Sequence, residues 1–270
     1  MILTNSTLYY FAMRGIRRAL FPVAIPRHIR RFIPALRPNC GTISAAGVVS
    51  LYDRHLTTPD GDWCAAKNVL EIGIGETNGS CYEMAARGAA RGFALEPFVR
   101  LDHAHDQRLL GECAQRHQQS PAVLAEKVTR ITSLATVETG SIDLALSNSV
   151  LEHVTDPAAL AADLRRVLRP GGHMLHIVDY RDHFFAFPYH HLLWSDRVWR
   201  WFLNPGDLPR WRIGDHMRAF ETNGFAVKTL MAKAIPAEFE KVRTRIHPKF
   251  QNYSEQDLTT AFGVLYVTAI

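Results

Sequence analysis

Residues 69–79 read VLEIGIGETNG, and this stretch decides the fold of the chain. An apolar run ends in an acid, a glycine-rich turn follows, and a segment of helical character comes next. The order predicts a strand, a tight turn and the start of a helix. Gly73 and Gly75 permit positive φ and let the backbone approach a ligand closely. In an open α/β sheet such a turn lies at the carboxyl end of a strand, where cofactors bind.

The glycine spacing and the acid Glu71 in this stretch indicate which kind of cofactor-binding fold it belongs to. A dinucleotide fold uses G-x-G-x-x-G, but here the third glycine position is Asn78 and the next glycine is Gly79. The lysine of a P-loop is also absent from the turn. A carboxylate at Glu71 repels a pyrophosphate and suits a cationic amino group. The stretch therefore argues against a nicotinamide oxidoreductase.

A second pair of stretches narrows the family. Residues 141–154 read SIDLALSNSVLEHV, and residues 164–173 read LRRVLRPGGH. Together with the Glu-x-Gly-x-Gly pattern, this series resembles the class I S-adenosylmethionine (SAM) methyltransferases, and among them the type 11 methyltransferase group. The resemblance spans about residues 60–180. It implies that the chain is an enzyme, that SAM is its cofactor and that its reaction is methyl transfer.

The order of strands and helices predicts an α/β fold with a mostly parallel sheet. Strands are expected near 67–72, 92–95, 127–132, 142–147, 173–178, 225–230 and 260–268, and helices near 78–88, 104–118, 157–168 and 214–223. We expect a doubly wound, Rossmann-like sheet; the resemblance implies seven strands, the last antiparallel. Residues 180–213 interrupt the alternation and are rich in aromatic residues and histidine, which indicates a lid insert after the fifth strand.

The charge is concentrated at the N-terminus. Residues 1–40 hold seven arginines and no acid, which leaves −2 on the other 230 residues from a net charge of +5. We therefore divide the chain into a basic amphipathic extension, 1–40, and a methyltransferase domain, 41–270. Apolar residues of 8–20 recur at helical spacing, with Arg14 on another face. The extension is predicted to pack on the sheet with solvated arginines, or else to contact an anionic membrane surface or substrate. A targeting peptide is a third interpretation.

The composition excludes several classes of protein. No apolar run reaches the ~18 residues that cross a bilayer, and no secretory signal is apparent. The four cysteines have no C-x-x-C spacing, so neither a disulfide framework nor a zinc site is expected. We predict a cytoplasmic location, with peripheral membrane contact through residues 1–40 as the alternative. Nucleic acid is not an expected partner, because the positive charge lies in a short extension.

Family resemblance assigns the cofactor contacts. The predicted SAM-binding residues are Glu71, Gly73, Gly75, Glu96, Phe98, Asn148 and Ser149. Glu71 is expected near the methionine end of SAM, with the glycines beneath it. A carboxylate at Glu96 can accept both ribose hydroxyls, as in dinucleotide folds. Phe98 is placed against adenine, and Asn148 and Ser149 beside the sulfonium. The acid that the family commonly carries after the third strand is absent from residues 132–135, TSLA.

The candidate catalytic residues are histidines and one acid: His183, His153, His190, His191 and Asp182. A hydroxyl acceptor is helped by a general base, most often histidine, and a carboxylate such as Asp182 can raise the basicity of an imidazole and fix its tautomer. His153 follows an acid in a pair common to the group, so a structural role is the alternative for it. No metal site is predicted, because the Glu-x-x-Glu-His pattern that binds Mg²⁺ in some relatives has Ser149 at its first acid.

The predicted function is SAM-dependent O-methylation of a sugar, a glycan precursor or another small hydroxylated acceptor. The stretch from His183 to Asp215 resembles methyltransferases of bacterial surface-polysaccharide clusters. An aromatic lid fits a sugar face, and the basic extension fits a phosphate-bearing or membrane-held acceptor. Two alternatives stay open: methylation of a lipid or quinone-like acceptor at the membrane surface, and a SAM-binding partner protein without catalysis.

Overall fold

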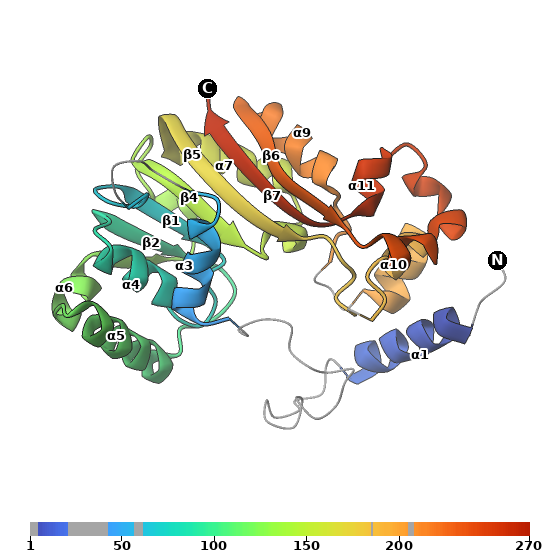
Figure 1. The fold of residues 1–270 in the computed structure, drawn as a ribbon, viewed down its shortest axis with the longest axis horizontal. Helices are drawn as coiled ribbons and strands as arrows, with labels where there is room; N and C mark the ends of the chain where they lie inside the picture. Colours follow the sequence, from blue (N-terminus) through green and yellow to red (C-terminus); the bar gives the residue numbers. More distant parts are fainter. Residues whose placement is uncertain (1–4, 21–42, 57–61, 185, 205–207) are drawn as a thin grey trace.

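The sheet has the architecture that the sequence predicts. The computed structural model describes residues 5–20, 43–56, 62–184, 186–204 and 208–270 (Figure 1). Within them, the strands are β1 (Asn68–Ile72), β2 (Arg91–Leu95), β3 (Val128–Ile131), β4 (Ile142–Asn148), β5 (Leu168–Asp179), β6 (Phe225–Ala234) and β7 (Thr260–Ala269). Their order is β3-β2-β1-β4-β5-β7-β6. β7 is antiparallel to both neighbours, and β1 to β5 pair in parallel. The predicted fold class is confirmed.

Helices cover both faces of this sheet. They are α3 (Ala45–Asp53), α4 (Gly79–Ala86), α5 (His103–His117), α6 (Pro121–Glu126), α7 (Pro157–Val167) and α9 (Ile213–Glu221). Val69 packs in one apolar cluster with α3 and α4, whereas Leu70 packs in another with α7 and α9. Successive side chains of a strand point to opposite faces, so a strand buried on both faces is a continuous apolar run. That run is what marks β1 in the sequence.

The turn after α7 differs from the prediction in one respect. Asp156 caps α7 by accepting a hydrogen bond from the Ala159 amide at 2.9 Å, and the helix ends at Val167, before the predicted stop signal Pro-Gly-Gly. However, β5 begins at Leu168, five residues before the expected start. Its pairing with β4 shifts register between Leu168 and His173. Pro-Gly-Gly thus forms an irregular start of the strand instead of a loop.

Two inserts, not one, cap the sheet beyond β5. The lid insert, 180–213, contains η4 (His190–Leu193), α8 (Asp196–Val198) and η5 (Trp199–Leu203). A second insert between β6 and β7 contains α10 (Pro236–Glu240), η6 (Arg243–Arg245), η7 (Pro248–Phe250) and α11 (Glu255–Thr259), and was not predicted. The two share one apolar cluster that includes Tyr189, Leu192, Trp194, Trp199, Phe239, Val242 and Phe250. These helical turns are too short to leave a periodic pattern in the sequence.

The N-terminal helix α1 (Asn5–Leu20) packs on the lid insert, against η5, and not on the sheet (Figure 1). Arg14 is only 2% exposed and forms an ion pair with Asp182. The expectation that the arginines of the extension are solvated is therefore wrong for Arg14, because a carboxylate and the Trp199 ring, 5.4 Å away, replace its water. The second predicted basic segment, 27–37, lies outside the described residues. In the described part of the chain, no helix is long and apolar enough to cross a bilayer.

Candidate functional site

The glycine turn after β1 borders open space. Gly73 and Gly75 have φ of +72° and +78°, the left-handed region that glycine favours. A Cβ added to Gly73 would lie 2.5 Å from a methyl of Val150, whereas one added to Gly75 would meet no atom within 4 Å. Gly73 therefore packs the turn onto the loop after β4, and Gly75 leaves room beside it. The predicted close approach of backbone to a ligand fits Gly75.

Glu96 joins this turn to the end of β2. Its side chain is buried and accepts hydrogen bonds from the amides of Gly75 at 2.9 Å, Phe98 at 3.0 Å and Val99 at 3.1 Å. A carboxylate has about four lone-pair sites, so one more donor can be accepted. A ribose contact of Glu96 stays a prediction, but the three amides leave one position and not the two that acceptance from both hydroxyls needs. Phe98 is 91% exposed, so its ring face is open to a partner.

Arg130 on β3 is a residue of this edge that the sequence reasoning missed. Its guanidinium donates to the carbonyl of Gly75 at 2.6 Å, to the carbonyl of Val99 at 3.0 Å and to Asn78 Oδ1 at 3.0 Å. It thus ties the turns after β1 and β2 together. The available signal was a basic residue within a short strand, directly before the residues where the family's acid is absent.

Glu71 is buried with half of its carboxylate unused. Oε1 accepts a hydrogen bond from the hydroxyl of Tyr52, with 2.7 Å between the two oxygen atoms. Oε2 has no hydrogen-bond partner among the described residues. Burial raises the pKa of Glu71 to about 8. A buried carboxylate without a counter-charge is costly, and a cationic ligand group would relieve that cost. The predicted contact with an amino group fits this geometry.

The end of β4 lies beside the glycine turn, because β1 and β4 are paired neighbours. Asn148 is the last residue of β4, and the exposed Ser149 follows with φ +55° and its amide donating to the carbonyl of Ile177 at 2.8 Å. A non-glycine residue in this region is held against strain of about 1–3 kcal/mol, and such residues cluster at functional sites. The structure therefore brings Ser149 and the glycine turn to one edge of the sheet.

Two of the predicted histidines meet at this edge. His153 lies in η3 (Leu151–His153) after β4, and His183 follows β5; their ring centroids are 4.8 Å apart. His153 is half-buried and His183 is buried. Glu152, the residue before His153, accepts a hydrogen bond from the backbone amide of Asp179 at 3.3 Å. Burial raises the pKa of Glu152 to about 8. The sequence placed these histidines in separate candidate regions, and the neighbouring strands β4 and β5 join them.

The other predicted catalytic residues have structural contacts instead. His190 and His191 are buried inside the lid, where burial lowers the pKa of His190 to about 4 and lowers that of His191 as well. Asp182 accepts hydrogen bonds from Tyr10 and Arg14 of α1 and from the Phe184 amide. Asp182 was predicted to hold the imidazole of a histidine, but its contacts make it the anchor of α1. His190 packs against the rings of Tyr10 and Phe187, and His191 packs against the ring of Trp199, so both belong to the packing inside the lid insert.

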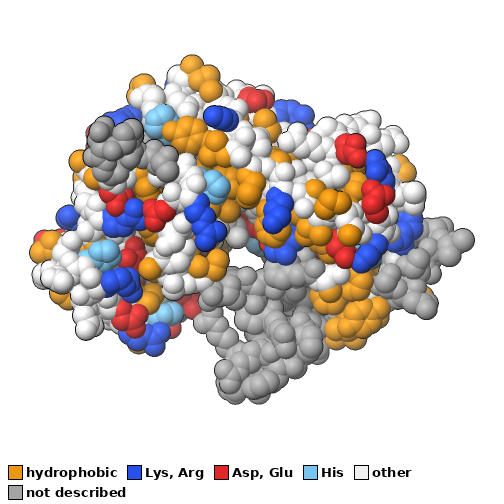
Figure 2. Space-filling model, viewed as in Figure 1, with side chains coloured by type: hydrophobic (Ala, Val, Ile, Leu, Met, Phe, Trp, Pro, Cys, Tyr) orange, Lys and Arg blue, Asp and Glu red, His pale blue; other side chains and the backbone are white. Residues whose placement is uncertain are grey.

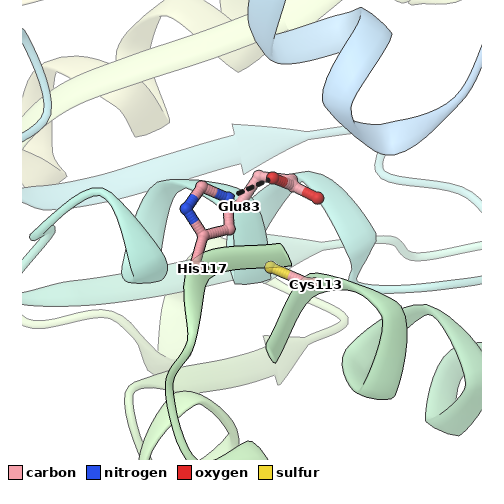
Figure 3. Close-up of side chains that lie close together, drawn as sticks. All are labelled: Glu83, Cys113 and His117. Carbon is pink, nitrogen blue, oxygen red and sulfur yellow. Dashed lines mark hydrogen bonds and ion pairs between the residues drawn. The ribbon is translucent and has the colours of Figure 1, made fainter. Parts of the chain in front are cut away.

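Three groups of described side chains have ligand atoms within 4.8 Å of one another and could hold a metal ion: Glu152, His153 and His183; Glu83, Cys113 and His117; and Glu76, Asp102 and His105. In the second, Glu83 of α4 meets two residues of α5 (Figure 3). Glu83 lies 2.9 Å from His117 Nε2 and also pairs with Arg116, so these contacts tie the two helices together. The prediction that the protein uses no metal stays a prediction.

Comparisons with known proteins match this geometry. A model of the family described as "Methyltransferase domain" matches residues 26–230. The chain belongs to this methyltransferase family. The predicted enzyme class is thereby confirmed, and SAM is the cofactor that membership of this family brings. The open space at Gly75 and the uncompensated Glu71 fit such a cofactor.

A solved structure shows the same fold, and two further proteins are similar to the chain. Phosphoethanolamine N-methyltransferase 2 of Haemonchus contortus, in complex with SAM, has a TM-score of 0.52 at 12% identity, over 94% of this chain and 59% of that one. A SAM-dependent methyltransferase from Mesorhizobium loti has a TM-score of 0.48 at 16% identity, over 83% and 99%. A Streptomyces fradiae protein described as "Uncharacterized 37.1 kDa protein in transposon TN4556" is 44% identical over 69 residues, 26% of this chain and 19% of that protein.

Substitution of Gly75 by valine is expected to weaken SAM binding at least about tenfold, a change of ~1.4 kcal/mol or more. The side chain would fill the open space and would strain the positive φ by roughly 1–2 kcal/mol. Gly171→Val is the matched control, because Gly171 has φ +71° and equally open surroundings but lies at the start of β5. Calorimetric titration of SAM should find the control unaffected. Equal affinities for the two variants would remove Gly75 from the cofactor site.

SAM binding is expected to release a proton from Glu71. Because its pKa is raised to about 8, this carboxyl is protonated in the free methyltransferase near neutral pH. A cationic amino group beside it favours the charged form and lowers that pKa. Affinity for SAM should therefore rise as the pH rises towards 8, and Glu71→Gln should lose this dependence. Calorimetry in two buffers with different ionisation heats measures the released proton; identical heats would contradict the assignment.

Proposed function

We propose that this methyltransferase transfers the methyl group of SAM to an oxygen of a sugar in a phosphate-bearing or membrane-held glycan precursor. The observation that carries the oxygen chemistry is the pairing of His153 with His183 beside the exposed Ser149. SAM supplies an already activated methyl group, bonded to a sulfonium that leaves as a neutral thioether. The residues of the chain must align the acceptor and remove its proton.

The histidine pair takes the proton of the acceptor hydroxyl. As the new C–O bond forms and the C–S bond breaks, that proton passes to a ring nitrogen of His183 or His153 and then to water. We place His183 first because it belongs to the lid insert, from which we expect the acceptor to enter, although His153 is the more exposed of the two. Glu71, Glu96 and the glycine turn hold the cofactor in this proposal.

The proposal that the acceptor is a sugar rests on the resemblance of residues 183–215 to methyltransferases of bacterial surface-polysaccharide clusters. The aromatic lid gives less support than expected, because Tyr189, Trp194 and Trp199 are buried in the lid's own apolar cluster. These rings hold the lid together and offer no face to a sugar. Only Trp201 and Phe202 of the lid insert's large aromatics are mostly exposed among the described residues.

A lipid or quinone-like acceptor is the second candidate. Exposed apolar side chains on α1 and η5 favour it, since they lie on the same side of the molecule as the lid. A SAM-binding protein without catalysis is the remaining alternative. It would keep the cofactor contacts and be indifferent to loss of the histidine pair.

An acceptor screen with methyl-labelled SAM tests the proposal. The panel holds nucleotide sugars, lipid-linked glycan precursors and quinone analogues, each incubated with the full chain. Label on a sugar oxygen supports the proposal, and label on a lipid or quinone alone supports the second candidate. SAM binding without turnover on any of these acceptors, in protein that is folded, would favour the non-catalytic alternative.

A further inference from the structure

Helix α1 buries two polar side chains and one tyrosine against the protein and leaves several apolar side chains exposed. Thr7, Tyr10 and Arg14 are buried against the lid and second inserts, whereas Leu8 and Ile16 are 49% and 48% exposed. A helix that only packs on a protein core has the reverse arrangement. Something other than the described part of this chain must therefore account for the outer face of α1.

The exposed apolar surface continues from α1 onto the lid insert. Trp201 and Phe202 of η5 are 62% and 58% exposed, and η5 packs directly against α1. Twelve large hydrophobic side chains are exposed in the described residues, and half of them lie on α1 and η5. These six are Leu8, Tyr9, Phe11, Ile16, Trp201 and Phe202. We call these six the apolar face. Figure 2 shows hydrophobic side chains gathered over α1 at the lower edge of the molecule.

The charge around the apolar face is positive. Arg197 and Arg200, on α8 and η5, are exposed. Asp196, the acid of this segment, is already paired with Arg210 and Lys249. Exposed apolar and aromatic side chains flanked by arginines are typical of segments that lie in the headgroup region of an anionic bilayer.

From these contacts we infer that the apolar face docks the methyltransferase onto an anionic membrane surface. A protein partner is less well matched, because the exposed guanidinium groups of Arg197 and Arg200 beside the aromatic residues complement the phosphates of lipid headgroups. Leu8, Ile16, Trp201 and Phe202 would enter the boundary between headgroups and acyl chains. Arg197 and Arg200 would meet the phosphates.

Docking there would also place the catalytic edge next to the bilayer. Tyr10 and Arg14, on the inner side of α1, hold Asp182, the residue before His183. The helix that would face the membrane therefore contacts the residue directly before the proposed base, His183. The benefit of this placement rests on the proposed function, because it would bring the catalytic edge close to a membrane-held acceptor. The docking itself does not depend on methyl transfer.

Vesicle co-sedimentation of the full chain tests the inference. The vesicles are phosphatidylcholine alone and equal parts of phosphatidylcholine and phosphatidylglycerol, at low and high salt. We expect binding to the anionic vesicles, weakened by salt, and a loss on the order of tenfold in Leu8→Glu/Trp201→Glu. Val123→Glu is the matched control, since Val123 is 47% exposed on the distant α6 and should bind as the wild type does.

The outcomes separate this inference from the proposed function. Circular dichroism and SAM titration show whether each variant is folded, and Arg197→Glu/Arg200→Glu gives a second variant that leaves the apolar side chains in place. Failure of the wild type to bind anionic vesicles, or equal binding of the double variants, overturns the inference. Light scattering that shows a dimer disrupted by Leu8→Glu would assign the apolar face to a second copy instead. None of these results depends on which acceptor is methylated.

Discussion

Replacement of His183 by alanine should lower the rate of methyl transfer by about 10²- to 10⁴-fold, the usual contribution of a general base. The affinity for SAM should stay within about twofold, because His183 lies with His153 on the acceptor side and not among the proposed cofactor contacts. The two effects are measured on the acceptor identified by the screen and by calorimetry. Free imidazole in the buffer should restore part of the activity, which a merely structural histidine would not allow.

His117→Gln is the control for this prediction. His117 lies at the C-terminal end of α5 and contacts Glu83 of α4, so it takes no part in the histidine pair that follows β4 and β5. Its loss should leave the rate unchanged. If His183→Ala kept full activity while His153→Ala lost it, the base would be His153. Full activity in both variants would exclude a histidine base and favour an acceptor that is already ionised.

The glycine turn and the acids beside it were predictable from sequence because each of these signals is local. Gly73 and Gly75 are needed where the backbone turns with positive φ, Glu71 is the next-to-last residue of β1, and Glu96 directly follows β2. Each of these signals occupies a few consecutive residues. Parallel pairing then brings strand ends to one edge of the sheet, so the approximate position of the edge follows from the order of elements alone.

The acceptor side could not be predicted in the same way, because its contacts join distant residues. Asp182 and His183 are neighbours in sequence, yet Asp182 binds Tyr10 and Arg14. The second insert packs against the lid insert without any motif of its own. Sequence spacing could not show which histidines the lid would bury and which it would leave at the edge. That choice depends on tertiary packing, which overrides local pattern.

The second large effect is expected at Arg212, whose side chain is fully buried. It donates to the carbonyls of Tyr180 at 2.7 Å, Asp257 at 2.8 Å and Thr260. These three residues lie directly after β5, in α11 and at the start of β7, so a single guanidinium ties the lid insert to the second insert and to two neighbouring strands. Arg212→Met would leave several buried carbonyls without a donor, each costing about 1–3 kcal/mol.

We therefore expect Arg212→Met to lower the free energy of unfolding by on the order of 3–5 kcal/mol. Arg218→Met is the matched control: Arg218 is exposed on α9 and pairs with Asp215 at 3.0 Å, and a surface pair contributes about 0–1 kcal/mol. Urea denaturation with an unchanged m-value measures both losses. A loss at Arg212 no larger than at Arg218 would mean that water replaces the guanidinium, and that the two inserts are held by their shared apolar cluster alone.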